Sequence, residues 1–597
     1  MAESPSTNST GPLSVTLTSD GTAISDRVAI ISMEVVARIN TIPWAKVVFE
    51  DGDMAAGSFP LSDGTQLVPG AVVTIEAGYG GQTRTIFKGV LVKHGVRVVR
   101  SGHSSLVIEC RDPAVKMTLA RRNAVYTDLN DSEIASKLIG SHSGLNAEVE
   151  KTEVVHAGMV QYYATDWDFL LSRAEVNGQV VIADSGKITV AAPEFTGSAA
   201  LVVTYGQDLI AFDAEMDARS QCAEIDAAAW DPETQELVKV GGEKPKGRSK
   251  QGNLTSRELA KVVGPKTFGL QSSAIIDKPQ LSNWAKAAQH KAELARIRGR
   301  VSFQGNALAK PGSLITLKGV GDRFNGDAWI GSVQHSLSDG EWITEVELGL
   351  APEWFVETHD VDALPASGRL PAIRGLHIGV VARVHEDPDN AYRVQVRIPV
   401  LHDDDNPVWA RLSHAQASKG FGSFYVPEID DEVVVGFIDD DPTQAIVMGS
   451  LYSKVNEPPY DMLEPNDIKA YVGRSKVKIE FDDERKRVMI ETPGGHRMTL
   501  DDEDKKVCVE DSHGNVMTLD DAGIRISSET DISIIARRDI SLEAGGNVNV
   551  EAKGDIKAEG INIEQSAKVG FKAKGGASAE LSASGNTTVK GAMVMIN

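Results

Sequence analysis

The sequence predicts a mainly β protein with a few helices, in which small barrels precede a repetitive β structure. From Asp531 onward, short strands of alternating apolar and polar residues recur every eight residues. Between residues 479 and 527, similar strands recur in steps of 19 residues. Five further short strands within residues 377–452 have the number and spacing of a small oligonucleotide/oligosaccharide-binding (OB)-type barrel. The 55 glycines and the low aromatic content of 6% fit a chain made of many short strands and turns.

The eight-residue repeat is too small to fold by itself. Its units begin at Asp531, Asp539, Asn547 and Asp555, and each unit places its apolar side chains on one face of a strand. Fixing eight residues costs roughly 1–2 kcal/mol each, whereas burying two apolar side chains returns only about 1.5–3 kcal/mol each. The repeat therefore predicts an intertwined prism in which several chains share one dry axis. The side chains expected on this axis are Ile532, Ile534, Ile540, Leu542, Val548, Val550 and Ile556.

The 19-residue repeat predicts pairs of antiparallel strands. Charged or glycine-bearing turns at 482–486, 501–506 and 520–523 separate neighbouring strands. The expected strands begin at Ile479, Val488, Met498, Val507, Met517 and Ile524. Residues 477–597 are thus predicted to form one repetitive β spike whose repeat tightens toward its end.

The rest of the chain is predicted to divide into several domains. Helices are expected at 130–139, after the capping sequence Thr165–Asp168, and from Ser282 to near Gly299. The predicted layout is a disordered N-terminus at 1–15, a first barrel at 16–115, a mixed α/β segment at 116–215, a second barrel with a helix at 216–365, the small OB-type barrel at 376–455, a linker at 456–476 and the spike at 477–597.

Composition excludes several classes of protein. The formal net charge of −23 argues against a nucleic-acid partner, because such a partner requires a basic surface. Cys110, Cys222 and Cys508 are widely spaced, which favours a reducing compartment without disulfides or a zinc site. The first residues lack the features of a secretory signal, and no apolar run approaches the 18 or so residues of a membrane span. We therefore expect synthesis in the cytoplasm without a signal peptide.

No catalytic, metal or cofactor site is expected. Nucleophile-elbow, zinc-protease, P-loop and Cys-x-x-Cys patterns are all missing from the sequence. Asp166 and Asp168 resemble paired catalytic carboxylates, but a helix cap explains them better. The run Asp439–Asp441 favours a turn over a calcium loop, and His94 and His103 favour structural or surface positions over metal ligands.

Several motifs resemble those of a known family. The segments Lys419-Gly-Phe-Gly-Ser-Phe-Tyr-Val-Pro427, 431–437 and 441–449 resemble the barrel signature of VgrG-type spike proteins of contractile injection systems. Residues 161–170 resemble a motif of the phage-hub-like half of that family. Arg298–Val301 and Pro311–Leu314 resemble a segment of its second barrel. The resemblance extends from about residue 15 to 597, and the N-terminal half is most similar to spikes of extracellular phage-tail-like particles.

The resemblance implies a homotrimer that caps the inner tube of an injection machine and pierces a target membrane mechanically. It implies that residues up to 365 form phage-hub-like barrels in a pseudo-sixfold ring, that the small barrels form a collar, and that 477–597 form a trimeric β-helix needle. The implied partners are the inner tube protein, baseplate proteins, a PAAR-like tip protein and effector cargo. The assembled particle would be delivered or released outside the cell. The apolar end formed by Met593, Val594, Met595, Ile596 and Asn597 is the expected seat of the tip protein.

Two rival hypotheses come from other protein classes. A β-helical tail-spike depolymerase that acts on cell-surface polysaccharide would have wide coils and an aromatic, carboxylate-lined groove, whereas the final repeat here is short and almost free of aromatics. A trimeric acyltransferase with a left-handed β-helix would have a period of six residues. The chain also departs from some members of the resembling family. It has no room for a hydrolase between Tyr452 and Lys478, and its last histidine, His513, is too far from the end for an iron-binding tip.

Overall fold

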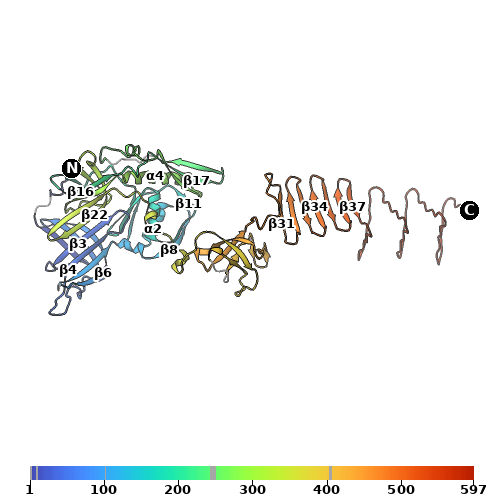
Figure 1. The fold of residues 1–597 in the computed structure, drawn as a ribbon, viewed down its shortest axis with the longest axis horizontal. Coiled ribbons are helices and arrows are strands. Elements are labelled where there is room, and N and C mark those ends of the chain that lie inside the picture. Colours follow the sequence, from blue (N-terminus) through green and yellow to red (C-terminus); the bar gives the residue numbers. More distant parts are fainter. Residues whose placement is uncertain (1–2, 8–10, 101–102, 243–249, 402–406, 597) are drawn as a thin grey trace. The chain divides into compact units, whose positions relative to one another are not determined.

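The computed structural model describes residues 3–7, 11–100, 103–242, 250–401 and 407–596, which form two compact units, Met1–Leu451 and Tyr452–Asn597. Strands are the main regular elements of both units, and the five α-helices among the described residues all lie in the first unit (Figure 1). The prediction of a mainly β protein with a few helices is confirmed.

The first unit is organised around one sheet of 13 strands in the order β16-β20-β23-β22-β3-β4-β7-β6-β5-β1-β2, in which β21 pairs with β22 and β15 pairs with β21. The sequence predicts two separate barrels here, but the structure joins their strands into a single sheet. The join forms because β22, 13 residues long, pairs with β23 on one side and with β3 on the other. The strands are β1 (Leu13–Ser19), β2 (Thr22–Ala23), β3 (Ile30–Arg38), β4 (Trp44–Glu50), β5 (Val72–Tyr79), β6 (Gln82–Val98), β7 (Ser104–Arg111), β15 (Leu201–Thr204), β16 (Leu209–Met216), β20 (Ile297–Gln304), β21 (Leu314–Lys318), β22 (Gly326–Ser338) and β23 (Glu341–Leu348).

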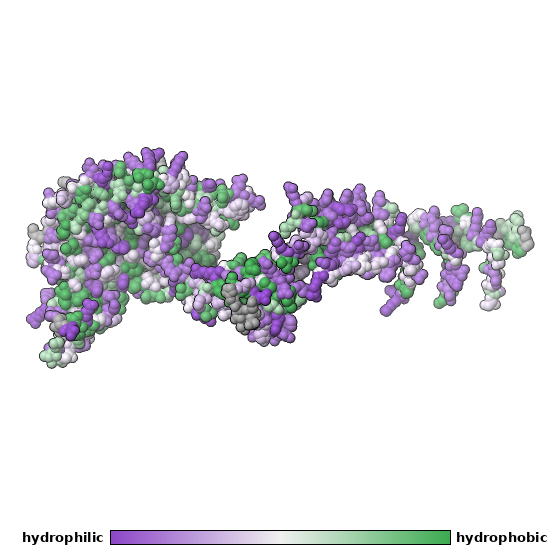
Figure 2. All heavy atoms as spheres, viewed as in Figure 1, coloured by the Kyte–Doolittle hydropathy of each residue, from purple (hydrophilic) through white to green (hydrophobic). Residues whose placement is uncertain are grey.

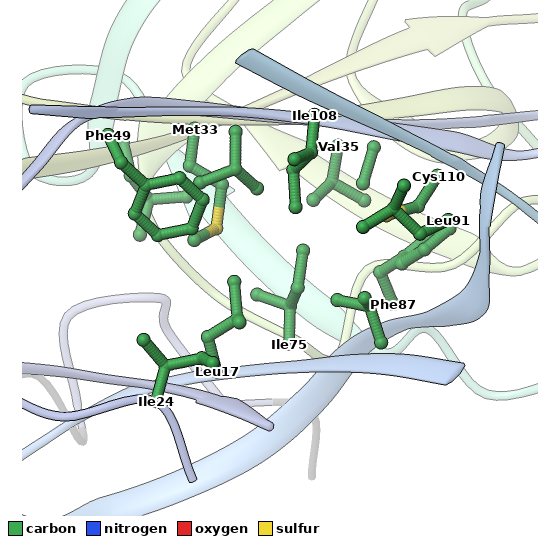
Figure 3. Packing of buried hydrophobic residues seen from close by; sticks show 14 of the residues in the cluster. Leu17, Ile24, Met33, Val35, Phe49, Ile75, Phe87, Leu91, Ile108 and Cys110 are labelled. Atoms are coloured by element: carbon green, nitrogen blue, oxygen red, sulfur yellow. The ribbon is translucent and has the colours of Figure 1, made fainter. Parts of the chain in front are cut away.

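Strict alternation of side chains builds the core between these strands. In β4, Ala45, Val47 and Phe49 are fully buried while the residues between them are more exposed, because successive side chains of a strand point to opposite faces. Figure 3 shows this cluster, to which β3, β5, β6 and β7 also contribute. Cys110 lies in it, and burial raises the pKa of its thiol to about 12, so this cysteine is a packing residue and not a reactive thiolate.

A mixed α/β region and a small helix-covered sheet complete the part of the first unit that precedes the small barrel, which we call the hub portion. Their strands are β8 (Arg121–Tyr126), β9 (Leu129–Asn130), β10 (Asn146–Val149), β11 (Val155–His156), β12 (Met159–Thr165), β13 (Val180–Asp184), β14 (Lys187–Ala191), β17 (Glu224–Asp231), β18 (Glu236–Gly241) and β19 (Thr267–Ser272). The helices are α1 (Asp131–Gly140), α2 (Asp166–Val176), α3 (Ser256–Leu259), α4 (Lys278–Leu294) and α5 (Phe355–Thr358). Helices α1 and α2 confirm the two predicted helices of the mixed segment.

The third predicted helix begins earlier than the sequence suggests. It is expected to open at Ser282, but α4 starts at Lys278, directly after Asp277. The Asp277 carboxylate accepts a hydrogen bond from the Gln280 N–H at 2.8 Å, and Pro279 lies in the first turn, where its missing N–H has no consequence. An aspartate cap followed by proline is the local signal that identifies this start.

The predicted small barrel is present and closed. Its strands β24 (His377–Arg383), β25 (Arg393–Arg397), β26 (Val408–Leu412), β29 (Glu432–Phe437) and β30 (Ala445–Ser450) close in the order β24-β25-β26-β30-β29. A two-stranded ribbon, β27 (Ala417–Ser418) and β28 (Phe421–Gly422), lies between the third and fourth of them along the chain. Valines and alanines fill the barrel core, as its narrow interior requires. The acidic run Asp403–Asp405 lies outside the described residues.

The second unit contains one antiparallel sheet of seven strands in chain order. They are β31 (Ile468–Val472), β32 (Lys478–Asp482), β33 (Arg487–Glu491), β34 (Arg497–Asp501), β35 (Lys506–Glu510), β36 (Val516–Asp520) and β37 (Gly523–Ser527). Strands β32–β37 confirm the hairpin-like pairs predicted from the 19-residue repeat. Strand β31 falls within the predicted linker 456–476 and pairs with β32, so the sheet begins before the predicted spike.

The N-terminal segment is more ordered than its composition predicts. Glu3 forms a parallel bridge with Leu201, and the Ser6 hydroxyl donates to the Asp208 carboxylate at 2.7 Å. Leu13 already belongs to β1. The prediction of a disordered segment over 1–15 is therefore wrong for its described residues, because long-range hydrogen bonds order polar residues that have no apolar signal of their own.

The buried His335 should make the stability of the hub portion sensitive to acid. Burial lowers the pKa of this imidazole from 6.5 to about 4, so the unfolded chain binds its proton first. The free energy of unfolding should be unaffected by this group above pH 6.5 and should fall by roughly 3 kcal/mol as the pH drops to 4, at ~1.4 kcal/mol per pKa unit. Urea unfolding of wild type and His335→Phe across this range measures it. An equal pH dependence in both proteins would contradict the assignment.

Candidate functional site

Strands β32–β37 of the second unit's sheet carry an uninterrupted apolar face. Strands β32–β37 each place two apolar side chains on it, and cross-strand pairing aligns these into two rows. The residues are Ile479, Phe481, Val488, Ile490, Met498, Leu500, Val507, Val509, Met517, Leu519, Ile524 and Ile526. Many of them are 38–69% exposed in the single chain, although this is the most hydrophobic surface of the sheet. Exposed contiguous apolar surface of this kind marks an interaction site.

Charged side chains on the opposite face pair with one another. Lys478, Glu491, Arg497 and Glu510 form a continuous ladder across four strands, with nitrogen–oxygen distances of 3.2, 2.7 and 3.1 Å. Figure 2 shows hydrophilic residues over most of the visible side of this sheet. A polar face that pairs internally is suited to water, which leaves the apolar face as the one that needs a partner.

Glu480 anchors the start of this ladder. Its side chain is buried, and it accepts hydrogen bonds from the Tyr460 hydroxyl at 2.7 Å and from Arg487 at 3.1 Å. Burial opposes its charge, but Tyr460, Lys478 and Arg487 outweigh that effect and hold the pKa of this carboxyl below its usual range. The polar face is thus fixed in its ionised form.

Matching aspartate turns set the register of the strands. Asp482 accepts a hydrogen bond from the Arg485 N–H at 3.1 Å, and Asp501 accepts the equivalent bond from the Asp504 N–H at 2.9 Å. Lys486 and Lys505 then adopt positive φ values of 51° and 50°, which let each turn reverse within a few residues. Register decides which face a side chain occupies, so these turns keep the apolar rows on one side.

The predicted axis residues lie downstream of the sheet. Ile532, Ile534, Ile540, Leu542, Val548, Val550 and Ile556 are 54–81% exposed in the single chain. Within the described residues 528–596 no strand pairing occurs inside the chain, so the single chain does not bring these side chains together. Their assignment to a shared axis stays a prediction. Met593, Val594, Met595 and Ile596 are also exposed, and Asn597 lies outside the described residues.

The apolar face of β32–β37 is a candidate interaction surface that the predicted site residues did not include. Its signal was present in the sequence, since each strand alternates strictly, as in Ile479-Glu-Phe481. What the alternation does not reveal is whether the apolar side meets another part of the same chain. The sheet is a single layer within the described part of the second unit, so nothing described in that unit covers its apolar side.

The two carboxylates near the start of α2 do not form an acid–base pair. Thr165 caps the helix by accepting from the Asp168 N–H at 3.0 Å, which confirms the capping interpretation. Asp166 is buried and holds together a polar network, in which its oxygens contact Arg122, Gln161 at 2.9 Å and His142 at 2.7 Å. A carboxylate with three such partners orients neighbouring elements and is not open to substrate.

The other sequence candidates also have structural roles. His94 donates from Nδ1 to the Leu67 carbonyl and accepts at Nε2 from the Ser62 hydroxyl, both at 2.7 Å. Asp441 accepts from the N–H and hydroxyl of Thr443, as in a turn. His103 is exposed. Across the described ranges no three His, Cys, Asp or Glu side chains gather closely enough to hold a metal ion. Their helices also include none with the length and apolarity of a membrane span.

Two family models match the sequence. Residues 9–339, more than half of the chain, match the Alg8 N-terminal domain, and residues 377–452 match the type VI secretion system/phage-baseplate injector OB domain. The second match coincides with the closed barrel β24-β25-β26-β30-β29.

The individual proteins that match include a spike protein, a tail protein and a type VI secretion component. A stretch of 151 residues is 29% identical to the type VI secretion system spike protein VgrG2a of Pseudomonas aeruginosa, and it covers 23% of this chain and 18% of that protein. The match spans less than a fifth of the length of this curated relative. Among solved structures, the 43 kDa tail protein of prophage MuSo2 from Shewanella oneidensis aligns with a TM-score of 0.43 at 9% identity, over 57% of this chain and 98% of its own. The Escherichia coli c3393 protein, a type VI secretion component, aligns with a TM-score of 0.37 at 12% identity, over 73% and 99% of the two chains.

The aspartate turns give a test of the sheet. Asp501 is 4% exposed and caps the turn between β34 and β35, so Asp501→Ala should lower the free energy of unfolding by about 1–2 kcal/mol. Asp501→Asn keeps an acceptor for the Asp504 N–H and should lose less. The exposed neighbour Asp502 provides the matched control as Asp502→Ala. Urea unfolding followed by limited proteolysis of the second unit measures the effect, and equal losses for Asp501→Ala and Asp502→Ala would refute the capping role.

Proposed function

The chain belongs to the family defined by the Alg8 N-terminal domain, and we propose that, as a VgrG-type spike protein, it forms the structural hub and spike of a contractile injection machine. The observation that carries this proposal is the apolar face of β32–β37, which is continuous, exposed and backed by an internally paired polar face. Such a sheet needs other copies of itself to remove its apolar rows from water.

A homotrimer is the assembly that fits this face. Two apolar residues at i and i+2 span about 7 Å along a strand, which suits a narrow prism closed by few copies. The resemblance to VgrG-type spikes supports three. Each copy would contribute one sheet to the prism, with its charge ladder in solvent and its apolar rows on the axis. The eight-residue repeat would continue this axis through Ile532, Ile534, Ile540, Leu542, Val548, Val550 and Ile556.

The mechanism that follows is mechanical. Strand pairing between chains and a dry axis would make the spike resist bending and unfolding as a unit. The hub portion would cap the inner tube and contact baseplate proteins. A PAAR-like tip protein would dock on the apolar end 593–597, with effector cargo carried alongside. Contraction would then drive the spike through the target membrane, outside the producing cell.

We infer no enzymatic activity for this chain. Its matched curated relative is a spike protein, and the candidate carboxylates are engaged in caps and buried networks. The rival depolymerase would need an aromatic, carboxylate-lined groove. On the apolar face of β32–β37 the one aromatic side chain is Phe481, and aliphatic residues and methionines occupy the other positions. This surface is suited to packing and not to sugar binding.

A carboxylate introduced on one face of the sheet or on the other distinguishes a loss of assembly from a loss of local stability. Ile490→Asp puts one carboxylate per chain into the proposed axis, and it should abolish the trimer because buried, unpaired like charges are strongly unfavourable. Thr518→Asp places the same charge on the polar face and should leave the trimer intact. Light scattering of the purified proteins gives the solution mass. A normal trimer of Ile490→Asp would exclude the axial position of this face, and Ile540→Asp tests the downstream axis in the same way.

Deletion of 531–597 separates the contributions of the two repeats. If the sheet β31–β37 already nucleates the assembly, the truncated protein should keep a mass of three chains but lose resistance to heat and detergent. If the eight-residue repeat is required, the truncated protein should be monomeric. Solution mass and the detergent resistance of the band on a gel are the two measurements. A full-length protein that is itself a monodisperse monomer would argue against the spike.

A further inference from the structure

A cavity of about 370 Å³, partly open to solvent, lies within the hub portion, at the junction of three parts of the chain. Strands β3 and β6 contribute one side, β22 contributes another, and the segments 182–185 and 307–311 close it. Its volume is within the range of pockets that hold small organic molecules. Its walls are largely apolar and include Val35, Phe87 and Val333.

His335 supplies a fixed polar group in this cavity. The side chain is 5% exposed, and its Nδ1 lies 2.9 Å from the Thr344 hydroxyl oxygen. That oxygen already accepts the Asn306 N–H at 2.9 Å, and Thr344 is fully buried. The threonine O–H proton therefore needs an acceptor, and Nδ1 is the acceptor at hand. This arrangement places the imidazole proton on Nε2.

The Nε2–H group is open to the cavity. Among the described residues, no group accepts a hydrogen bond from it. The Nε2 atom is also absent from the set of unpaired polar atoms that are fully buried, so it is accessible from the cavity. His335 itself lines the cavity. Burial keeps the ring neutral, since it lowers the pKa to about 4. The cavity therefore contains a neutral N–H donor that is held rigidly and lacks an acceptor.

The charged side chains of the other walls narrow the class of ligand. Lys310 and Asp184 line the cavity but pair with each other at 3.0 Å, and Lys88 is exposed to solvent. Asp112 also lines the cavity, is 1% exposed, and is held by the N–H groups of Ala114 at 2.8 Å and Gly186 at 3.1 Å. A second carboxylate entering this space would bring a like charge toward this buried group, which is unfavourable. A neutral acceptor such as a carbonyl oxygen meets no such opposition.

We infer that this cavity is a binding site for a small uncharged molecule that has an aliphatic body and one carbonyl oxygen, with the oxygen accepting from His335 Nε2–H. The apolar walls would enclose the aliphatic body. Because the walls come from β3 and β6, from β22 and from the segment 182–185, an occupant would tie these parts together. Binding to the folded state alone would therefore raise the thermal midpoint of the hub. The inference stands independently of the proposed spike function.

Cyclohexanecarboxamide and its anionic analogue cyclohexanecarboxylate are suitable probes. Ligand-observed NMR and thermal unfolding of the full chain should detect saturable binding of the amide, with a higher thermal midpoint, and at least tenfold weaker binding of the carboxylate. His335→Phe keeps a ring in place but removes the donor, and it should weaken amide binding about tenfold. Ala307→Leu fills the cavity while keeping His335 and should abolish binding.

The controls locate the site and keep the test decisive. Ala124→Leu makes the same change at a half-buried position in another cluster and should bind the amide as wild type does. If His335→Phe does not fold, Ala307→Leu against Ala124→Leu decides alone. Absence of saturable amide binding to wild type overturns the inference. So does amide binding that Ala307→Leu leaves unchanged, or equal affinity for the amide and the carboxylate.

Discussion

The central constraint on this molecule is that each strand of its C-terminal sheet has one face that is satisfied and one that is not. Lys478, Glu491, Arg497 and Glu510 neutralise one another across the polar face, so that side needs only water. The apolar rows opposite have no covering layer in the described part of the second unit. Their burial has to come from outside this unit, and the proposed assembly would supply it.

The two parts of the second unit differ in whether their backbone N–H and C=O groups pair within the chain. From Ile468 to Ser527 the chain reverses at each turn, and its N–H and C=O groups pair within one sheet. Downstream, the described residues have no strand partners in the same chain. If this segment packs against other copies, its buried backbone groups need partners, and an intertwined arrangement of several copies would supply them. The sheet would then hold the copies in register while the eight-residue repeat winds together.

Local signals were enough to predict most strands, and long-range pairing was not. Alternation has a period of two and can be recognised from a few residues. This is why the starts of β32–β37 were predicted to within one residue and the five strands of the small barrel were expected. The pairing of β3 with β22 joins residues about 300 positions apart and leaves no trace in either strand alone. The contacts of Ser6 with Asp208, and of His335 with Thr344 and Asn306, have the same character. The cavity therefore had no sequence signal, whereas the apolar face of the sheet did.

The symmetry of the proposed assembly would explain why the apolar face has no polar position. All twelve of its positions in β32–β37 are apolar, whereas the other face mixes Lys, Glu, Arg, Thr, Met and Cys. In an assembly of identical chains, any residue on the shared axis occurs once per copy at the same height. A single charged side chain would then become a ring of like charges in a dry interior, with a desolvation penalty of several kcal/mol for each ion. On the solvent face the same substitution adds separate, hydrated charges that interact weakly. The difference in composition between the two faces is therefore the pattern expected of a self-associating sheet, and it arises from each strand separately, before any partner is considered.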